Sequence, residues 1–193
     1  MGPWRRRPRE DYGARSFILE ALPGASIGAE IGVDRGEFAS RLLRHLRPAR
    51  LHLVDPWEYR TEAVYGDSLY GGRLGVDQSH MDGLHEKVCR RFRKEIARDQ
   101  VLIHRARSQD AAATFPAQYF DWIYIDGDHR YEAVRADLER YHDRIKANGW
   151  IAGSGYRSKA WWGDGVVRAV GEFVASGHAR HYARRHDVFL IQL

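Results

Sequence analysis

Short apolar runs alternate along this chain with longer segments in which apolar residues recur every three or four positions. Compact apolar runs bounded by turn residues or charge predict strands, whereas the spacing of three and four predicts amphipathic helices. The runs that predict strands are 27–33, 51–55, 101–104, 122–126 and 150–153. An alternation of this kind is typical of a parallel sheet whose strands are joined by crossover helices.

Five apolar stripes predict the helices, because the residues of each stripe fall on one helix face. The stripes are Tyr131, Val134, Leu138, Tyr141 and Ile145; Met81, Leu84, Val88, Phe92 and Ile96; Phe38, Leu42, Leu43 and Leu46; Val166, Val170, Phe173 and Val174; and a shorter one around Phe17, Ile18 and Leu22. We interpret all of them as core packing. The segment 59–78 contains several glycines, has no clear period and is predicted to be a loop.

Two segments at the end of the chain, 180–184 and 188–193, are joined by only Arg185, His186 and Asp187. This short connection predicts an antiparallel hairpin. Together with the five earlier strands it gives an α/β fold, a doubly wound and mostly parallel seven-stranded sheet with an antiparallel C-terminal hairpin.

Length and charge indicate one domain with a basic extension. The 193 residues suit a single fold, and we assign 1–13 to a flexible basic tail and 14–193 to the domain. The net charge of +5 comes from 31 basic and 26 acidic side chains. Much of this excess lies in 5–9 and in 90–94, which we interpret as solvated surface, so that the sequence disfavours a nucleic-acid partner.

Several other classes of protein are disfavoured by simple features of the sequence. Cys89 is the single cysteine, which excludes an internal disulfide and a zinc site built on paired thiols. No apolar stretch is long enough for a membrane span, and the arginine-rich start lacks the apolar run of a secretion signal. We therefore expect a cytoplasmic protein without a membrane partner. The oligomeric state stays open, with a homo-oligomer among the alternatives.

A glycine-containing turn follows the first predicted strand and leads directly into a predicted helix. Gly32 and Gly36 lack a Cβ atom, so the backbone can approach a ligand closely, and the helix start offers unpaired N–H groups. A nucleotide-like ligand fits this arrangement, although a tight strand-to-helix turn alone would also explain it. The acid Asp34 stands where a pyrophosphate would lie, which disfavours a dinucleotide.

An acid ends the second predicted strand, about 20 residues after the turn. In a doubly wound sheet, the Asp55 carboxylate at this place can accept hydrogen bonds from both hydroxyls of a ribose. Pro56 and Trp57 follow and would shape an adenosine pocket. The alternative is that Asp55 caps a helix or stabilises a turn.

Two acids and a histidine follow a further apolar run. Asp126, Asp128 and His129 are delivered to the carboxyl end of a buried strand, the edge at which open α/β sheets bind ligands. His129 can act as a general base near neutral pH when a neighbouring carboxylate orients it. We favour a capping role for Asp128 at the helix that starts near Arg130, and a solvated His129 is the alternative.

These motifs resemble the class I S-adenosylmethionine-dependent methyltransferases, and among them the small macrolide-sugar and antibiotic-tailoring O-methyltransferases. The likeness runs from Gly28 to Phe173 and rests on 30–36, 54–57, 124–132 and 149–153. It implies a Rossmann-like fold, S-adenosylmethionine as cofactor and methyl transfer to an oxygen of a small molecule. It implies catalytic roles for His129 and Asp126. The cofactor-binding residues that it implies are Glu30, Gly32, Val33, Asp34, Gly36, Asp55, Pro56, Trp57, Ser108 and Asp126.

One position departs from the pattern of the family that the chain resembles. After the fifth predicted strand this chain has Ser154 and Gly155 where an acid is usual. That acid, with one matching Asp126, would help to hold a divalent cation, so we expect no divalent metal. Tyr156, Trp161 and Trp162 are candidate walls of an acceptor pocket, or core residues.

Three alternatives to an O-methyltransferase stay open at this point. The first is a protein that binds the cofactor without methyl transfer, and the second is a cofactor-bound enzyme of a different reaction. The third is a nucleic-acid methyltransferase that uses the basic clusters.

Overall fold

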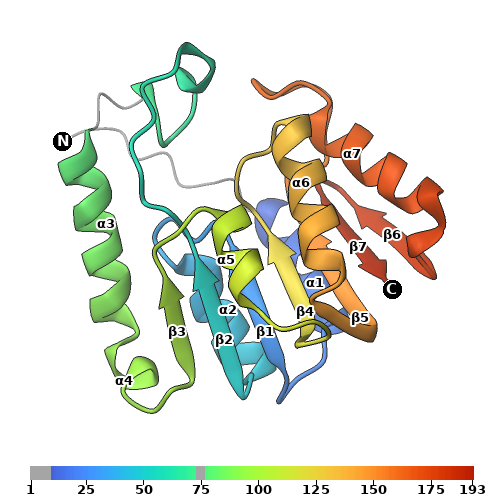
Figure 1. Ribbon diagram of the computed structural model, residues 1–193, viewed down its shortest axis with the longest axis horizontal. Coiled ribbons are helices and arrows are strands. Elements are labelled where there is room, and N and C mark those ends of the chain that lie inside the picture. The colour runs from blue at the N-terminus through green and yellow to red at the C-terminus, as the bar shows by residue number, and fades with distance from the viewer. Residues whose placement is uncertain (1–9, 73–76) are drawn as a thin grey trace.

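A computed structural model describes residues 10–72 and 77–193 and shows one seven-stranded sheet with helices on both faces (Figure 1). The strand order is β3-β2-β1-β4-β5-β7-β6. The strands are β1 (Ile27–Ile31), β2 (Arg50–Val54), β3 (Val101–His104), β4 (Phe120–Ile125), β5 (Ile145–Gly153), β6 (His181–Arg185) and β7 (Val188–Gln192). Pairing is parallel from β3 to β5 and antiparallel where β7 meets β5 and β6. The predicted Rossmann-like fold and C-terminal hairpin are confirmed.

Helices follow most of the parallel strands, as the apolar stripes predict. They are α1 (Glu10–Ala21), α2 (Glu37–Leu46), α3 (Gln78–Arg91), α4 (Arg93–Ile96), α5 (Ser108–Thr114), α6 (Tyr131–His142) and α7 (Gly165–Phe173), with short turns η1 (Ala63–Tyr65) and η3 (Val174–His178). Across the described ranges, no helix combines the length and the apolar character needed to cross a membrane.

The helices form two layers that sandwich the sheet (Figure 1). Apolar residues of α1, α2 and α3 pack against one face, together with Trp122 and Tyr124 of β4. Residues of α5, α6 and α7 pack against the other face, together with Ile123 and Ile125. The alternation of these four β4 residues between the two layers is what a strand buried on both faces requires.

Some element boundaries differ from the predicted ones for local reasons. β1 ends at Ile31 because Gly32, at a φ of +88°, leaves the extended conformation. Ile145 belongs to β5 and pairs with Phe120, although its spacing continued the stripe of α6. Phe92, at a φ of −103° and ψ of 18°, separates α3 from α4 within a stripe that predicted one helix.

The N-terminal boundary also differs from the expectation. α1 begins at Glu10, so residues 10–13 are helical rather than part of a tail, and residues 1–9 of that tail lie outside the described residues. The buried side chains of Ile18 in the helix and of Leu22 just after it pack into the core on the α2 face of the sheet. Residues 73–76 of the predicted loop are likewise outside the described ranges, and the part before them contains η1.

The buried His52 and the half-buried His104 lie side by side on the α5 face of the sheet. His52 Nδ1 is 2.9 Å from His104 Nε2, and His52 Nε2 is 3.2 Å from the Tyr119 hydroxyl. Burial and the neighbouring His104 lower the pKa of His52 from 6.5 to about 4. Because the unfolded chain binds this proton more readily, the full stability is present above pH 6.5 and is lost as the pH falls toward 4.

We expect acid destabilisation between pH 6.5 and pH 4, to which His52 contributes about 3 kcal/mol. The measurement is the free energy of unfolding in urea at a series of pH values, for the wild type and for His52→Gln. The variant should be less stable at pH 7 and should show a shallower pH dependence. His181→Gln, at an exposed position of β6, is the control. An equally steep pH dependence in His52→Gln would contradict the prediction.

Candidate functional site

The carboxyl ends of β1, β2 and β4 meet at one edge of the sheet and bring together three segments that the sequence analysis singled out. Gly32 follows β1, Asp55 follows β2 and Asp126 follows β4. The backbone N–H of Gly32 donates to Val54 O at 2.9 Å, and that of Asp126 donates to Ile31 O at 2.7 Å. The three segments are therefore locked together by the same backbone ladder that builds the sheet.

Gly32 and Gly36 are required by packing within the chain itself. A Cβ atom on Gly32 would collide with the carbonyl oxygen of Asp126, and one on Gly36 would lie 2.8 Å from the Phe92 ring. Both residues also have a positive φ, +88° and +69°, which a residue without a Cβ adopts at no steric cost. A tight strand-to-helix turn thus explains both glycines, whether or not a ligand approaches them.

Asp55 is buried and receives hydrogen bonds on both carboxylate oxygens. Its Oδ2 accepts from the backbone N–H groups of Val33 (2.8 Å) and Asp34 (3.1 Å) and from the Tyr70 hydroxyl (2.6 Å), and its Oδ1 accepts from Trp57 N (2.8 Å). Burial raises the pKa of Asp55, although these bonds act in the opposite direction. A carboxylate offers about four acceptor positions. Oδ2 already accepts three hydrogen bonds, so a ribose hydroxyl would compete with Tyr70 for this oxygen of Asp55.

A cavity of about 390 Å³ lies between the residues that follow Asp55 after β2, the first residue of α3 and the chain after β3. Its lining residues are Pro56, Trp57, Glu58, Gln78, Arg105, Ala106 and Arg107. Pro56 and Trp57, predicted to shape an adenosine pocket, are thus at a cavity. Ser108 is outside it, because its hydroxyl donates to the buried Asp137 of α6. Arg105, Ala106 and Arg107, the three residues before Ser108, line the cavity in which Ser108 was expected.

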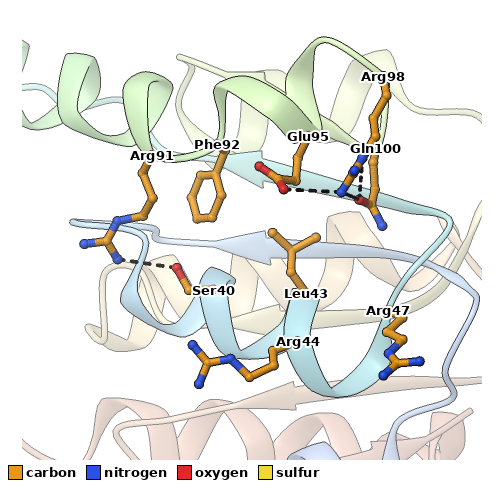
Figure 2. Close-up of a pocket in the computed structure, with 9 residues that line it drawn as sticks. All are labelled: Ser40, Leu43, Arg44, Arg47, Arg91, Phe92, Glu95, Arg98 and Gln100. Carbon is orange, nitrogen blue, oxygen red and sulfur yellow. Dashed lines mark hydrogen bonds and ion pairs between the residues drawn. The ribbon is translucent and has the colours of Figure 1, made fainter.

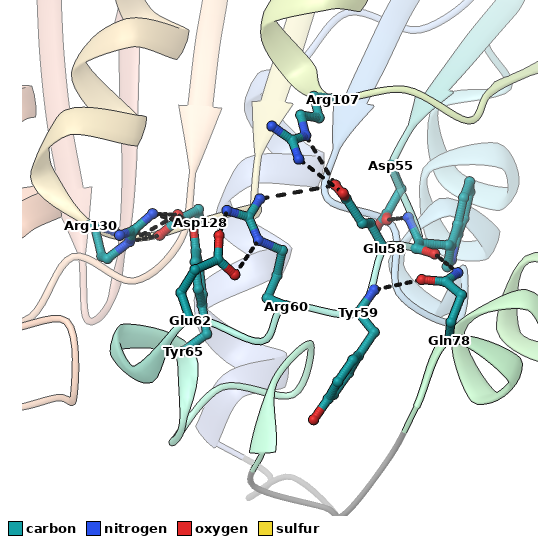
Figure 3. Close-up of polar contacts among 11 residues, drawn as sticks. Asp55, Glu58, Tyr59, Arg60, Glu62, Tyr65, Gln78, Arg107, Asp128 and Arg130 are labelled. Carbon is teal, nitrogen blue, oxygen red and sulfur yellow. Dashed lines mark hydrogen bonds and ion pairs between the residues drawn. The ribbon is translucent and has the colours of Figure 1, made fainter.

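The loop after β2 is tied across this edge by charged side chains (Figure 3). The Tyr65 hydroxyl donates to Asp128 Oδ2 at 2.9 Å, and Arg130 binds both Asp128 oxygens. Arg107 donates to both Glu58 oxygens, at 3.0 and 2.9 Å. Asp128 also accepts the backbone N–H of Arg130 at 3.0 Å. Arg130 is itself the N-cap residue of α6 and the helix has no side-chain cap, so Asp128 stabilises the turn before the helix and the predicted capping role is wrong.

His129 fills the space next to Gly155. Its Nε2 atom is 3.5 Å from Asp126 Oδ1, and its ring centroid is 4.6 Å from that of Trp162. A Cβ atom on Gly155 would lie 2.8 Å from the imidazole ring. The histidine thus stands where the family resemblance places an acidic side chain. Trp162 forms a wall beside it, whereas Trp161 is exposed at the surface.

Tyr156, the other aromatic candidate, packs toward the C-terminal hairpin, with ring centroids 6.5 Å from Tyr182 and 6.4 Å from Phe189. Its place is therefore at the margin of the core rather than beside His129. Within the described part of the chain, no group of three or more His, Cys, Asp or Glu side chains is arranged to hold a metal ion.

An arginine from the first helix reaches the same edge. Arg15 Nη2 donates to Asp126 Oδ2 at 2.8 Å, and the Ser154 hydroxyl donates to Asp126 Oδ1. Burial alone would raise the pKa of Asp126, but Arg15, His129 and Ser154 outweigh it and hold this pKa well below its ordinary value. Asp126 is therefore a stable anion and not a base at neutral pH.

Three buried polar atoms beside Asp126 lack a hydrogen-bond partner among the described residues: the Glu30 Oε2 atom, the Tyr124 hydroxyl oxygen and His129 Nε2, which is in contact with Asp126 at 3.5 Å. Burial, and next the nearby Asp126, raises the pKa of Glu30 well above its ordinary value. Unsatisfied buried polar groups cost free energy, which a polar ligand at this edge would recover. The residues present therefore fit a polar ligand that carries positive charge.

Arg15, Tyr70 and Tyr124 are residues of this edge that the sequence analysis missed. Tyr124 lies in a predicted strand and resembles any other core aromatic, and Tyr70 lies in a segment without periodicity. Arg15 is separated from Asp126 by 111 positions. Among the three, Arg15 offers one signal, since it is a charged residue next to the apolar stripe around Phe17.

Comparison with protein families matches residues 29–154 to a family described as a methyltransferase domain. The chain belongs to this family. The match begins in β1 and ends just after β5, so it includes the carboxyl ends of β1, β2 and β4 with Asp55, Asp126 and His129, while Arg15 of α1 lies outside it. It confirms the resemblance to class I S-adenosylmethionine-dependent methyltransferases, while the O-methyltransferase branch is not addressed by it.

One curated relative, a protein of Acanthamoeba polyphaga mimivirus described as uncharacterized, is 27% identical over 115 residues, 57% of this chain and 52% of the viral protein. The chain thus spans about half the length of the curated relative that it matches.

Three solved structures share the fold at low sequence identity. A proposed rRNA methylase of Clostridium thermocellum has a TM-score of 0.64 and 10% identity, with 97% of this chain and 98% of that chain covered. SMU.1697c of Streptococcus mutans, a proposed methyltransferase in complex with SAH, has a TM-score of 0.61 and 13% identity, with 97% of this chain and 99% of that chain covered. The N-methyltransferase NodS of Bradyrhizobium japonicum in complex with SAH has a TM-score of 0.59 and 16% identity, with 98% of this chain and 90% of that chain covered. Two of these names describe the reaction further, one by its rRNA substrate and the other by transfer to nitrogen.

Proposed function

We propose that this chain transfers a methyl group from S-adenosylmethionine to an oxygen of a small molecule. The observation that carries the proposal is the His129–Asp126 pair at the carboxyl edge of the sheet, next to buried polar groups that lack partners among the described residues. The family match and the two related structures solved with SAH support the choice of cofactor.

The cofactor would supply an electrophilic methyl group on a sulfonium. Asp55, with the Pro56–Trp57 side of the neighbouring cavity, would hold the nucleoside, and Glu30 with Asp126 would face the positively charged end. Asp34, Val33 and the two glycines would contribute through the shape of the turn, whose N–H groups fix Asp55. Ser108 would act indirectly, by holding α5 to Asp137 of α6.

His129 is the residue that can take a proton from the acceptor. The contact of Nε2 with the Asp126 carboxylate favours a proton on that nitrogen and leaves Nδ1 with a lone pair. A hydroxyl held at Nδ1 would lose its proton to this nitrogen, while the contact with Asp126 keeps the ring oriented. Alignment of the acceptor oxygen with the methyl group then supplies most of the acceleration.

We expect His129→Ala to lower turnover by about a hundredfold or more and to leave cofactor affinity nearly unchanged. The measurement is SAH release with a panel of small alcohols and phenols, together with calorimetric titration of SAH. His181→Ala, at an exposed position of β6, is the control. Full turnover of His129→Ala over the whole pH range would contradict the role of His129. Wild-type protein that binds SAH and methylates none of the acceptors would favour the alternative of binding without methyl transfer.

A second candidate function is methyl transfer to a nucleic acid, and a basic groove favours it (Figure 2). The groove has a volume of about 510 Å³ and lies between α2 and the α3–α4 segment. Four arginines line it, Arg44, Arg47, Arg91 and Arg98, with one acid, Glu95. Glu95 and Gln100 bind Arg98, and the carbonyl of Gly36 accepts from Arg91. Methylation of RNA, with binding that weakens steeply as salt is added, would favour this candidate over a small acceptor.

A further inference from the structure

Arg15 is held at the sheet edge by three side chains. Its guanidinium carbon lies 5.0 Å from the centroid of the Phe38 ring and 5.7 Å from that of Tyr124, and Nη2 donates to Asp126 at 2.8 Å. The side chain is 9% exposed. Contacts with two aromatic rings and a carboxylate fix the position and orientation of a guanidinium group, so Arg15 is preorganised.

The surroundings of Arg15 are strongly acidic. Asp126, Asp55 and Asp34 all act on the ionisation of Glu30, and Arg15 is the cation that opposes them there. S-adenosylmethionine carries a sulfonium, an ammonium and a carboxylate. The acids attract the first two groups and repel the third. A carboxylate at this edge would be favoured beside a cation that compensates for the repulsion, and Arg15 is such a cation, in contact with Asp126.

We propose that Arg15 binds the carboxylate of the amino-acid end of S-adenosylmethionine and that Asp126 positions Arg15 for this role. A guanidinium has five N–H donors in a rigid fork, so one Arg15 can bind Asp126 and a second carboxylate together. Glu30, whose Oε2 atom lacks a partner among the described residues, would then be available to accept a hydrogen bond from the ammonium. This inference rests on the proposed function and adds a residue to the cofactor site that the sequence analysis did not assign.

The test uses calorimetric titration with two ligands that differ in one group, S-adenosylmethionine and its decarboxylated analogue. Both keep the nucleoside, the sulfonium and the amine. Wild-type protein should bind S-adenosylmethionine about tenfold to a hundredfold more tightly than the analogue. In Arg15→Gln this ratio should fall to about one, because only the ligand with a carboxylate loses a partner. Arg90→Gln, an exposed arginine of α3, should keep the wild-type ratio.

Each outcome decides a separate point. A wild-type ratio retained in folded Arg15→Gln overturns the assignment, as does an equal loss of affinity for both ligands, which would mean that Arg15 only supports the fold. Circular dichroism and thermal unfolding establish folding. If Arg15→Gln does not fold, Arg15→Lys keeps a charge beside Asp126 without the fork, and an undiminished ratio in that variant overturns the proposal. Wild-type protein that binds neither ligand refutes the proposed function itself.

Discussion

Asp55→Ala should lower the free energy of unfolding by about 3 kcal/mol. The substitution leaves the N–H groups of Val33, Asp34 and Trp57 and the Tyr70 hydroxyl without their acceptor, in a site where Asp55 is 1% exposed. Each buried donor without a partner costs about 1–3 kcal/mol, and removal of a buried carboxylate recovers part of that sum. Urea unfolding of the two proteins measures the difference.

Companion variants separate the contribution of Asp55 to the fold from its role in binding. Tyr70→Phe removes one donor and should cost about 1 kcal/mol or less. It should also tighten SAH binding, since a ribose hydroxyl no longer competes with Tyr70 for Asp55. Asp67→Ala, in the exposed part of the same loop, serves as the control. Asp55→Ala of wild-type stability would show that the turn does not depend on this carboxylate, and unchanged SAH affinity in that variant would remove Asp55 from the cofactor site.

The sheet could be predicted because its information is local. The stripe of α6 has a helical period, and 122–126 is a short compact apolar run that ends in an acid, which is typical of a strand buried on both faces. α5 was not predicted, because Ser108–Thr114 is a short segment with three adjacent alanines and no apolar stripe. Ile145 continued the helical spacing of α6, yet backbone pairing with Phe120 placed it in β5. The boundary between α6 and β5 is therefore set by pairing with a distant segment, which cannot be predicted from the spacing of apolar residues along the chain.

The candidate site was predictable to the extent that strand ends carry its residues. Asp55, Asp126 and His129 follow strands and therefore meet at one edge. The partners of these residues come from elsewhere, Arg15 from α1 and Tyr70 from the loop after β2. Such contacts depend on how α1 and the loop pack across the edge, which no local pattern encodes. Gly155 is a further example. In the sequence it indicates only that the usual acid is missing, whereas in the structure the absence of its Cβ atom leaves space for the His129 ring.

Gly155→Asp, which places the usual family acid in this chain, should therefore inactivate the protein rather than create a metal site. The new Cβ atom would lie 2.8 Å from the His129 ring, at a φ of +77° that costs a residue with a side chain about 1–2 kcal/mol. Overpacking adds about 1–3 kcal/mol, and the new charge stands near the anionic Asp126. We expect a loss of stability of about 3 kcal/mol and, in the folded fraction, a loss of turnover of about a hundredfold or more, because His129 is displaced from Asp126.

Gly155→Ala distinguishes steric displacement of His129 from the effect of the new charge, since it adds the Cβ atom without a carboxylate. Most of the loss should already be present in this variant, because the distance from the Cβ position to the His129 ring is the same in both. Turnover is measured with and without magnesium after exhaustive chelation, together with thermal unfolding. A magnesium ion requires several oxygen ligands in near-octahedral geometry. A carboxylate at position 155 adds one such group and displaces His129, and we expect that it does not complete a cation site. Activity of Gly155→Asp that disappears on chelation and returns with magnesium would show that Asp126 and the new acid form a cation site, and that His129 is dispensable to the reaction.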